Sequence, residues 1–160
     1  MKKFFLILTI FLVFATYSKE LVGKVIKVSD GDTITILDSN NKKRKVHLDR
    51  IDAPESDQAF GKKSRNYLAK LIENKKVTVT YKKVDRYKRI LGIVKLDDMD
   101  VNYHMVETGH AWHYSHYDKT ASYKAAHANA KLKKLGLWQE SNPIEPFIFR
   151  KQNKKKSKRR

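Results

Sequence analysis

The strongest constraint on the fold is the strand-like patterning of residues 20–52. Three runs in this stretch are rich in β-branched and other apolar residues, at positions 20–28, 33–37 and 43–48. Turn-forming residues separate these runs, because Gly31 can adopt a positive φ at no steric cost and residues 38–41 are all polar. The sequence therefore predicts a three-stranded meander, and acidic residues stand near two of its strand ends.

The rest of the chain mixes helical and strand-like periodicity. The expected elements are a helix at residues 61–74, strands at 77–84 and 90–96, and helices at 101–108 and 119–135. Gly109 and Gly136 follow the last two helices, as is usual just beyond a helix C-terminus. Residues 142–149 contain two prolines, so we expect an irregular strap there. Five short strands followed by a helix-rich half predict an α+β domain, a small barrel with helices at one side.

The first 18 residues have the pattern of a secretory signal peptide. A positive start at residues 1–3 precedes an apolar run at 4–15, which is shorter than the about 20 residues needed to span a bilayer. Thr16 and Ser18 are small residues at the right separation for cleavage after Ser18. We therefore expect export to the periplasm, the cell surface or the medium, with membrane contact only through the transient signal peptide. An uncleaved amphiphilic anchor is the alternative.

Composition indicates a polyanionic partner. The formal net charge is +18, and Lys151 to Arg160 alone contribute seven positive charges without an apolar side chain. We expect this segment to form a disordered basic tail, so that the folded domain spans residues 19–150. Such a charge favours nucleic acid or an acidic membrane surface as partner. The sequence has no cysteine, which excludes disulfides and thiolate metal sites.

Carboxylates gather beside the turns of the predicted meander, in a chain that is otherwise basic. They are Asp30, Asp32, Asp52 and Glu55. Crowded carboxylates raise one another's pKa, and a hard divalent cation such as calcium would relieve the repulsion. Asp32 and Asp52 are the candidate ligands, assisted by the carbonyl of Ala53, which Pro54 biases towards an extended conformation. Two unrelated acidic turns at strand ends are the alternative.

These acids, together with nearby basic residues, predict phosphodiester chemistry. Glu55 lies three positions beyond Asp52, close enough to hold or deprotonate a water beside the metal. Arg89 stands in a predicted turn, where its guanidinium suits bidentate contact with phosphate. Tyr87 would lie on the same side of that turn if the turn is extended. Such a site clamps the phosphoryl oxygens, positions a nucleophile and supplies a base.

Three ordered stretches resemble the signature motifs of the thermonuclease (staphylococcal nuclease-like) family. They are Asp30-Gly31-Asp32-Thr33, Leu48-Asp49-Arg50-Ile51-Asp52-Ala53-Pro54-Glu55 and Asp85-Arg86-Tyr87-Lys88-Arg89. The resemblance implies a five-stranded OB-fold β-barrel with three α-helices, and calcium-dependent hydrolysis of DNA and RNA with low sequence specificity. It also implies that Asp32 and Asp52 bind calcium. Glu55 would be the base and Arg89 would stabilise the transition state, in a protein that we expect to be a monomer without a protein partner.

His47 is the main departure from the family pattern. The family usually has an arginine second in a Val-Arg-Leu run, and this sequence reads Val46-His47-Leu48. An imidazole cannot make a forked contact with phosphate, so efficiency is in question. We expect His47 to act in the clamp position, with Lys45 on the same strand face as a nucleic-acid contact. A catalytically weakened or inactive OB-fold nucleic-acid-binding protein is therefore the alternative function.

Histidines and aromatic residues crowd the segment 104–117. A zinc or copper site is conceivable at His104, His110, His113 and His116. Tyr117 and its aromatic neighbours better suit stacking on nucleic-acid bases beside cationic groups. A basic surface protein that holds acidic polymers or membrane would need only the charge, and it would leave the acidic residues unexplained.

Overall fold

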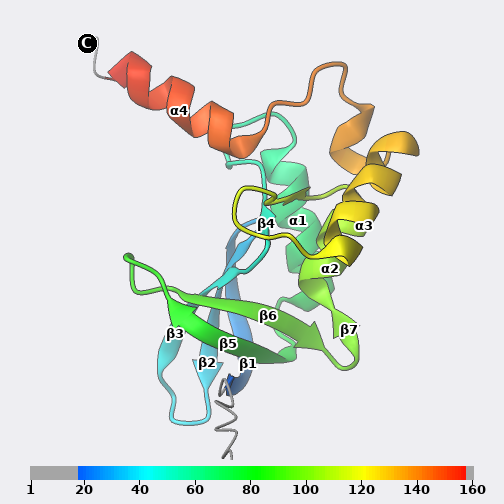
Figure 1. Ribbon diagram of the computed structural model, residues 1–160. Helices are drawn as coiled ribbons and strands as arrows, with labels where there is room; N and C mark the ends of the chain where they lie inside the picture. The colour runs from blue at the N-terminus through cyan, green and yellow to red at the C-terminus, as the bar shows by residue number, and fades with distance from the viewer. Residues whose placement is uncertain (1–17, 158–160) are drawn as a thin grey trace, which may run out of the picture.

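The computed structural model describes residues 18–157, and its centre is a small β-barrel (Figure 1). Five strands form the barrel: β1 (Lys19–Asp30), β2 (Thr33–Asp38), β3 (Lys43–Leu48), β5 (Lys76–Val84) and β6 (Ile90–Leu96). Antiparallel pairing gives the order β3-β2-β1-β5-β6, and parallel pairing of β3 with β6 closes the barrel. The predicted α+β class and five-stranded OB-fold barrel are confirmed.

Alternation along the strands places one set of side chains inside the barrel. This interior consists of aliphatic residues with no exposed surface: Val25, Val28, Ile34, Ile36, Val46, Leu48, Val79 and Val94. β-branched residues dominate the set because they fit the pleated surface of a strand. Lysines and threonines occupy the opposite faces of β3 and β5. The period of two that predicts the strands therefore also defines the core.

Three helices pack on one side of the barrel, close to the predicted residues (Figure 1). They are α1 (Gly61–Ile72), α2 (Val101–Glu107) and α3 (Ala121–Leu132). α1 packs against β1, and α2 contacts both β6 and α3. Four short elements complete this part: β4 (Ile51–Asp52), β7 (Met99–Asp100), β8 (Trp112–His113) and the 3₁₀ helix η1 (Gly136–Gln139). The pairing of β4 with β8 ties the segment that carries Asp52 to the helical layer.

A further helix, α4 (Pro146–Ser157), corrects the predicted end of the chain. Residues 142–145 are irregular as expected, whereas α4 replaces the irregular strap expected at residues 146–149 and the disorder expected from residue 151, as far as Ser157. Pro146 is the first residue of α4, a position where the missing N–H costs nothing, and lysine is a good helix former. The folded chain therefore continues past residue 150, with four α-helices among the described residues instead of three.

Two predictions fall on residues that the structure does not describe. The signal peptide expected at residues 1–18 lies outside the described residues apart from Ser18, and it stays a prediction. Tail residues 158–160 lie outside as well. Between residues 18 and 157, no helix is long and apolar enough to cross a membrane.

Candidate active site

Hydrogen bonds join the two acidic motifs at the end of the meander. Asp32 Oδ2 accepts a bond of 2.9 Å from the backbone N–H of Ala53, and its Oδ1 accepts one of 2.9 Å from the Thr33 hydroxyl. The Leu48 N–H adds a backbone link by donating to the Asp32 carbonyl at 2.8 Å. Asp32 is 6% exposed and Asp52 is 3% exposed. Two carboxylates that are far apart in the sequence are thus brought to one buried place.

Close packing around Gly31 fixes the turn that carries Asp32. A Cβ atom at Gly31 would overlap Ser64 Oγ of α1 and would come within 2.8 Å of the Ala53 Cβ. Ser64 is fully buried, and its hydroxyl donates to the His110 carbonyl at 2.7 Å. Gly31 is therefore required for space between the turn, α1 and the second acidic motif. The sequence suggests a positive φ at Gly31, but Gly31 does not have a positive φ in this turn.

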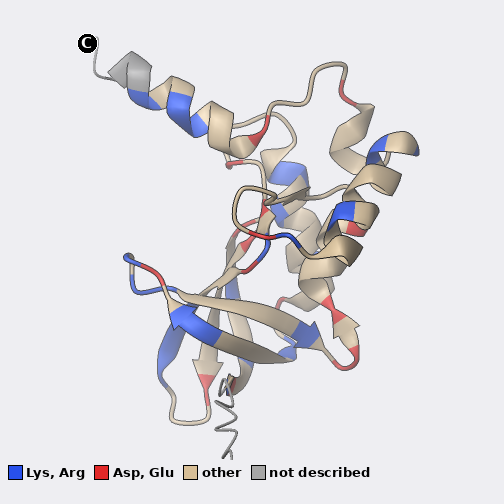
Figure 2. Ribbon diagram, viewed as in Figure 1, with Lys and Arg blue, Asp and Glu red and all other residues tan. Residues whose placement is uncertain are grey.

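A cavity of about 700 Å³ opens at these carboxylates, bounded by the barrel and α4. It is lined by every residue that the sequence predicts for the site: Asp32, Asp52, Ala53, Glu55, Arg89, His47, Tyr87, Lys45 and Tyr117. The candidate metal ligands, catalytic groups and nucleic-acid contacts therefore share one space. Figure 2 shows Lys and Arg on the barrel strands, on the turn between β5 and β6 and on α4.

His47 faces the candidate metal ligands. Its Nδ1 lies 3.3 Å from Asp32 Oδ1 and 3.3 Å from Thr33 Oγ1. Burial by itself would lower the pKa of His47, but the Asp32 carboxylate outweighs burial and raises it. Burial would likewise raise the pKa of Asp32, yet the charge of His47 brings that pKa below its usual value. The pair therefore favours an imidazolium beside a carboxylate.

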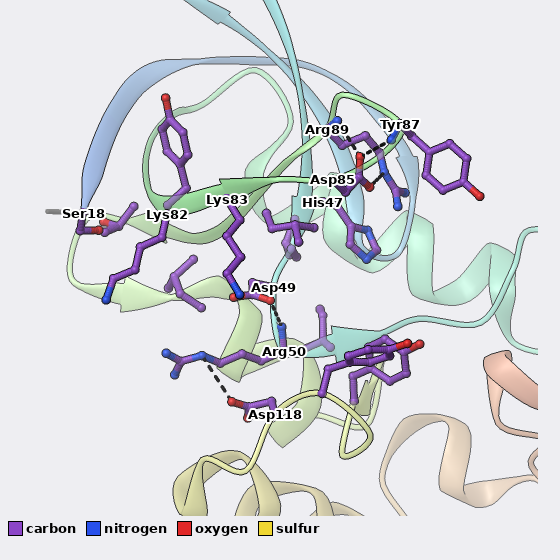
Figure 3. A pocket seen from close by; sticks show the side chains of 18 of the residues that line it. Ser18, His47, Asp49, Arg50, Lys82, Lys83, Asp85, Tyr87, Arg89 and Asp118 are labelled. Carbon is purple, nitrogen blue, oxygen red and sulfur yellow. Dashed lines mark hydrogen bonds and ion pairs between the residues drawn. The ribbon is translucent and has the colours of Figure 1, made fainter. Parts of the chain in front are cut away.

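Asp85 holds Arg89 in the turn between β5 and β6. Asp85 Oδ2 accepts a bond of 2.7 Å from Arg89 Nε, and its Oδ1 accepts bonds from the backbone N–H groups of Tyr87 and Arg89. Burial by itself would raise the pKa of Asp85, but the hydrogen bonds from Arg89 lower it. The guanidinium also lies 5.5 Å from the centre of the Tyr87 ring. Arg89 is thus fixed by its Nε edge where it lines the cavity, and Figure 3 shows it beside Asp85.

Arg150, which no sequence motif indicates, reaches the centre of the site from α4. Its Nη1 donates to Asp52 Oδ1 at 2.9 Å and to Glu55 Oε1 at 2.8 Å, and its Nη2 donates to Asp52 Oδ2 at 2.8 Å. The hydrogen bonds to Asp52 and Glu55 raise the pKa of Arg150. Burial keeps the pKa of Asp52 above its usual value even beside this guanidinium. Arg150 belongs to no motif and is 98 positions from Asp52, so no local pattern indicates the contact.

A second cavity, of about 790 Å³, shares its wall with the first. Both are lined by His47, Arg86, Tyr87, Arg89, Tyr114 and Tyr117. The second cavity adds the cationic side chains of Arg50, Lys82 and Lys83, which Figure 3 shows around it. The two cavities together form a groove lined by tyrosines and cations, which suits a polyanion whose bases can stack.

Known proteins are similar in sequence to this chain over most of its length. Residues 45–140 match the family model described as staphylococcal nuclease homologue. This chain belongs to the staphylococcal nuclease family. Among its relatives, an uncharacterized endonuclease of Haemophilus influenzae is 44% identical over 149 residues, which cover 92% of this chain and 84% of the relative. A micrococcal nuclease of Shigella flexneri is 40% identical over 143 residues, which cover 82% of each chain.

The staphylococcal nuclease model covers only part of the site. Asp52, Glu55 and Arg89 lie within the matched residues, whereas Asp32 precedes them and Arg150 follows them. The three sequence stretches that resemble the family's motifs include Asp32 but not Arg150. Only the three-dimensional structure therefore joins Arg150 to the residues that the family pattern indicates.

The carboxylate oxygens of the first cavity are ligands of the kind that a hard divalent cation prefers. Asp30, Asp32, Asp52 and Glu55 all line the first cavity. Burial raises the pKa of Asp30, and the charges of Asp32 and Glu55 raise it further. Arg150 already places a positive charge where this repulsion needs compensation. In the described part of the chain no three His, Asp or Glu side chains are arranged to hold an ion, so carbonyl oxygens and waters would have to complete its shell.

The histidines near residue 110 take structural positions instead of forming a metal site. The Tyr67 ring stacks on both His104 and His110, with centroid distances of 6.0 and 3.6 Å. His113 instead binds the Asp118 carboxylate through Nε2 at 2.9 Å. Across residues 18–157, no cluster of three such side chains could hold a metal. The described residues therefore do not support the zinc or copper alternative.

Proposed function

We propose that this protein is a calcium-dependent endonuclease that hydrolyses phosphodiester bonds of DNA and RNA with low sequence specificity. The observation that carries the proposal is the shared cavity, in which the buried Asp32 and Asp52 lie beside Glu55. Membership of the staphylococcal nuclease family supports the reaction class. Low specificity is expected because cations contact phosphates and tyrosines stack on any base.

The residues of the cavity divide the chemistry between them. Asp32, Asp52 and the Ala53 carbonyl would hold the cation, which polarises a phosphoryl oxygen when bound. Glu55, whose side chain is 34% exposed, would take a proton from the attacking water. Arg89 would donate to the nonbridging oxygens, where negative charge grows in the transition state. Its bond to Asp85 orients the guanidinium before the substrate arrives.

The polymer would lie along the groove on both sides of the reacting phosphate. Lys45 and His47 offer positive charge from β3, and both line the first cavity. Tyr87 is 63% exposed and Tyr117 is 80% exposed, so both rings are available to bases. Exposed rings beside cations bind single-stranded nucleic acid by stacking and charge together.

A nucleic-acid-binding protein with weak or no catalysis is the second candidate, and His47 is the observation that favours it. Its imidazole cannot fork around a phosphate, and its Nδ1 already lies 3.3 Å from Asp32. A protein that only binds nucleic acid would not need Glu55 beside two buried carboxylates, and for this reason we place catalysis first.

We also propose that the protein is exported, on the strength of the signal-peptide pattern in residues 1–18. Mass spectrometry of protein recovered from outside the cytoplasm should find an N-terminus at Lys19. A recovered chain that still begins at Met1 would contradict cleavage.

The proposed activity is tested by incubating the purified protein with plasmid DNA and with RNA in calcium, in magnesium or with a chelator. We expect hydrolysis in calcium and none with the chelator. Magnesium should support little cleavage, because it demands near-ideal octahedral geometry and dehydrates reluctantly. Full activity in magnesium without calcium would contradict the calcium assignment. Binding without cleavage under every condition would favour the second candidate.

A further inference from the structure

α4 presents one face to the active-site cavity. Its cavity-lining residues are Phe147, Arg150, Lys151 and Lys154, at spacings i, i+3, i+4 and i+7. Residues at these spacings lie on one side of an α-helix. The beginning of α4 is attached nearby, because Gln58 donates to the Ile144 carbonyl and the Phe147 ring lies 5.2 Å from the His116 ring. α4 is therefore docked with a largely cationic face towards the cavity.

Both terminal nitrogens of Arg150 donate hydrogen bonds to Asp52 and Glu55, the carboxylates to which we assign cation binding and proton transfer. It contacts both oxygens of Asp52 and one oxygen of Glu55, at 2.8–2.9 Å. Asp52 is a proposed cation ligand and Glu55 is the proposed base, so a cation and a water need these same oxygens. A cation on Asp52 beside the guanidinium would also place two positive charges within a few ångströms. Arg150 cannot keep these contacts in the working site.

We propose that Arg150 is a phosphate-binding residue of the active site that exchanges one anion for another. In the resting protein its guanidinium holds Asp52 and Glu55, and it transfers to nonbridging phosphate oxygens when cation and substrate bind. This inference rests on the proposed nuclease function. A guanidinium fork matches carboxylate and phosphate oxygens alike, so the same two nitrogens can bind either group. The docked helix keeps Arg150 at the cavity after it leaves Asp52.

The position of Arg150 complements what the barrel supplies. β3 contributes His47, whose imidazole lies against Asp32 and cannot form a fork. Arg89 reaches the cavity from the turn between β5 and β6, and Arg150 reaches it from α4. Two guanidinium groups from different elements therefore line one cavity, and in the proposed complex both would bind the nonbridging oxygens of the phosphate, where charge grows during the reaction.

Calcium binding, measured by calorimetry without nucleic acid, tests the exchange at the carboxylates. Arg150→Gln removes the guanidinium that occupies Asp52, so we expect its calcium dissociation constant to fall about five- to tenfold. Arg44→Gln is the matched control, because Arg44 pairs with the buried carboxylate of Asp38 at 2.9 Å and lies outside both cavities. Its calcium affinity should equal that of the wild type.

Turnover on DNA at saturating calcium tests whether the Arg150 guanidinium binds the phosphate after it leaves Asp52. We expect the kcat of Arg150→Gln to be about 10²-fold below that of the wild type. Arg150→Lys keeps the charge but not the fork, so its kcat should stay at least about tenfold below the wild type. Thermal melting of each variant by circular dichroism checks that the fold is kept. Tighter calcium binding with slower turnover is a combination that a merely structural role of Arg150 does not produce.

Other outcomes contradict the proposal. Tighter calcium binding with unchanged or faster turnover in Arg150→Gln would overturn the phosphate role. An unchanged calcium affinity would overturn the exchange. If the wild type and Arg44→Gln cleave neither DNA nor RNA, the proposed function itself fails. The calcium titration then still decides whether Arg150 competes for the carboxylates.

Discussion

At the scale of single residues, the site depends on carboxylates that would repel one another without partners. The oxygens of Asp32 are shared by Thr33, Ala53 and His47, whereas both oxygens of Asp52 bind Arg150. The acids were predictable because they stand in short motifs beside turns. Arg150 was not predictable, because its place depends on how a distant helix docks.

Glu55→Gln tests the proposed base. Its kcat should fall by about 10²–10⁴-fold while KM changes little, because a general base acts in the transition state and not in substrate binding. Steady-state kinetics on DNA in calcium measure both constants. Glu107→Gln, at an exposed position of α2 outside both cavities, is the control and should match the wild type. Normal turnover in Glu55→Gln would place the base elsewhere.

Gly31→Ala tests the packing that fixes the Asp32 turn. The added methyl group would overlap Ser64 Oγ, so we expect a loss of about 1–3 kcal/mol in the free energy of unfolding. Urea denaturation measures this loss. In a Ser64→Ala background the same change should cost less, because part of the overlap is gone. Equal costs in both backgrounds would mean that Ser64 does not limit the space.

At the scale of elements, periodicity predicts the five barrel strands and three of the helices, within a few residues at their ends. It does not predict the pairing of β4 with β8, because two-residue strands carry no periodic signal and their register depends on long-range packing. It also misses α4. The two prolines and the run of lysines count against regular structure there, although Pro146 stands at the first helical position.

Two half-buried histidines should make the fold less stable in mild acid. Burial, with the neighbouring charge of His104, lowers the pKa of His110 from 6.5 to about 4. Burial, with the charge of His113, likewise lowers the pKa of His127 from 6.5 to about 4. Between these pH values the two histidines bind more protons in the unfolded chain than in the folded protein, so their contribution to stability is full above pH 6.5 and falls as pH decreases towards 4. Urea midpoints from pH 7 to pH 4.5 measure the effect.

His127→Gln is the variant that isolates one of these groups. His127 Nδ1 accepts a hydrogen bond from the His113 N–H at 3.1 Å, which requires that nitrogen to be unprotonated. The variant should be less stable at pH 7 but should lose less stability between pH 7 and pH 4.5 than the wild type. An equal loss of stability in the variant and the wild type over this range would contradict the prediction.

The cationic face of α4 should add to the salt dependence of DNA binding. Removing two charges with Lys151→Gln and Lys154→Gln should lower the slope of log K against log salt by up to about 1.8, because fewer counterions are released. Binding in a chelator, without cleavage, measures the slope. Lys124→Gln with Lys133→Gln removes two exposed charges outside both cavities and is the control. Equal slopes for the two double variants would show that α4 does not touch the polymer.

At the scale of the whole molecule, the closed barrel is one wall of the site, and the segment 112–117 and α4 provide the others. The fold class was predictable from the order of strand and helix patterns. The same order predicted a small barrel, but periodicity does not show which strands close it, because the parallel pairing of β3 with β6 joins strands far apart in the sequence. The formal charge of +18 favours polyanionic partners, and in the proposed mechanism the carboxylates would confine hydrolysis to one point of the groove.

In the proposed mechanism Asp32 and Asp52 form the cation site for DNA hydrolysis. The most direct test is the initial rate of DNA cleavage against calcium concentration for the wild type, Asp52→Asn and Asp38→Asn. Asp38 is also buried and paired with an arginine, but it lies outside both cavities. We predict that Asp38→Asn follows the wild-type curve and that Asp52→Asn loses most of its activity at every calcium concentration. Cleavage by Asp52→Asn at the wild-type rate, with the same calcium dependence, would contradict the claim.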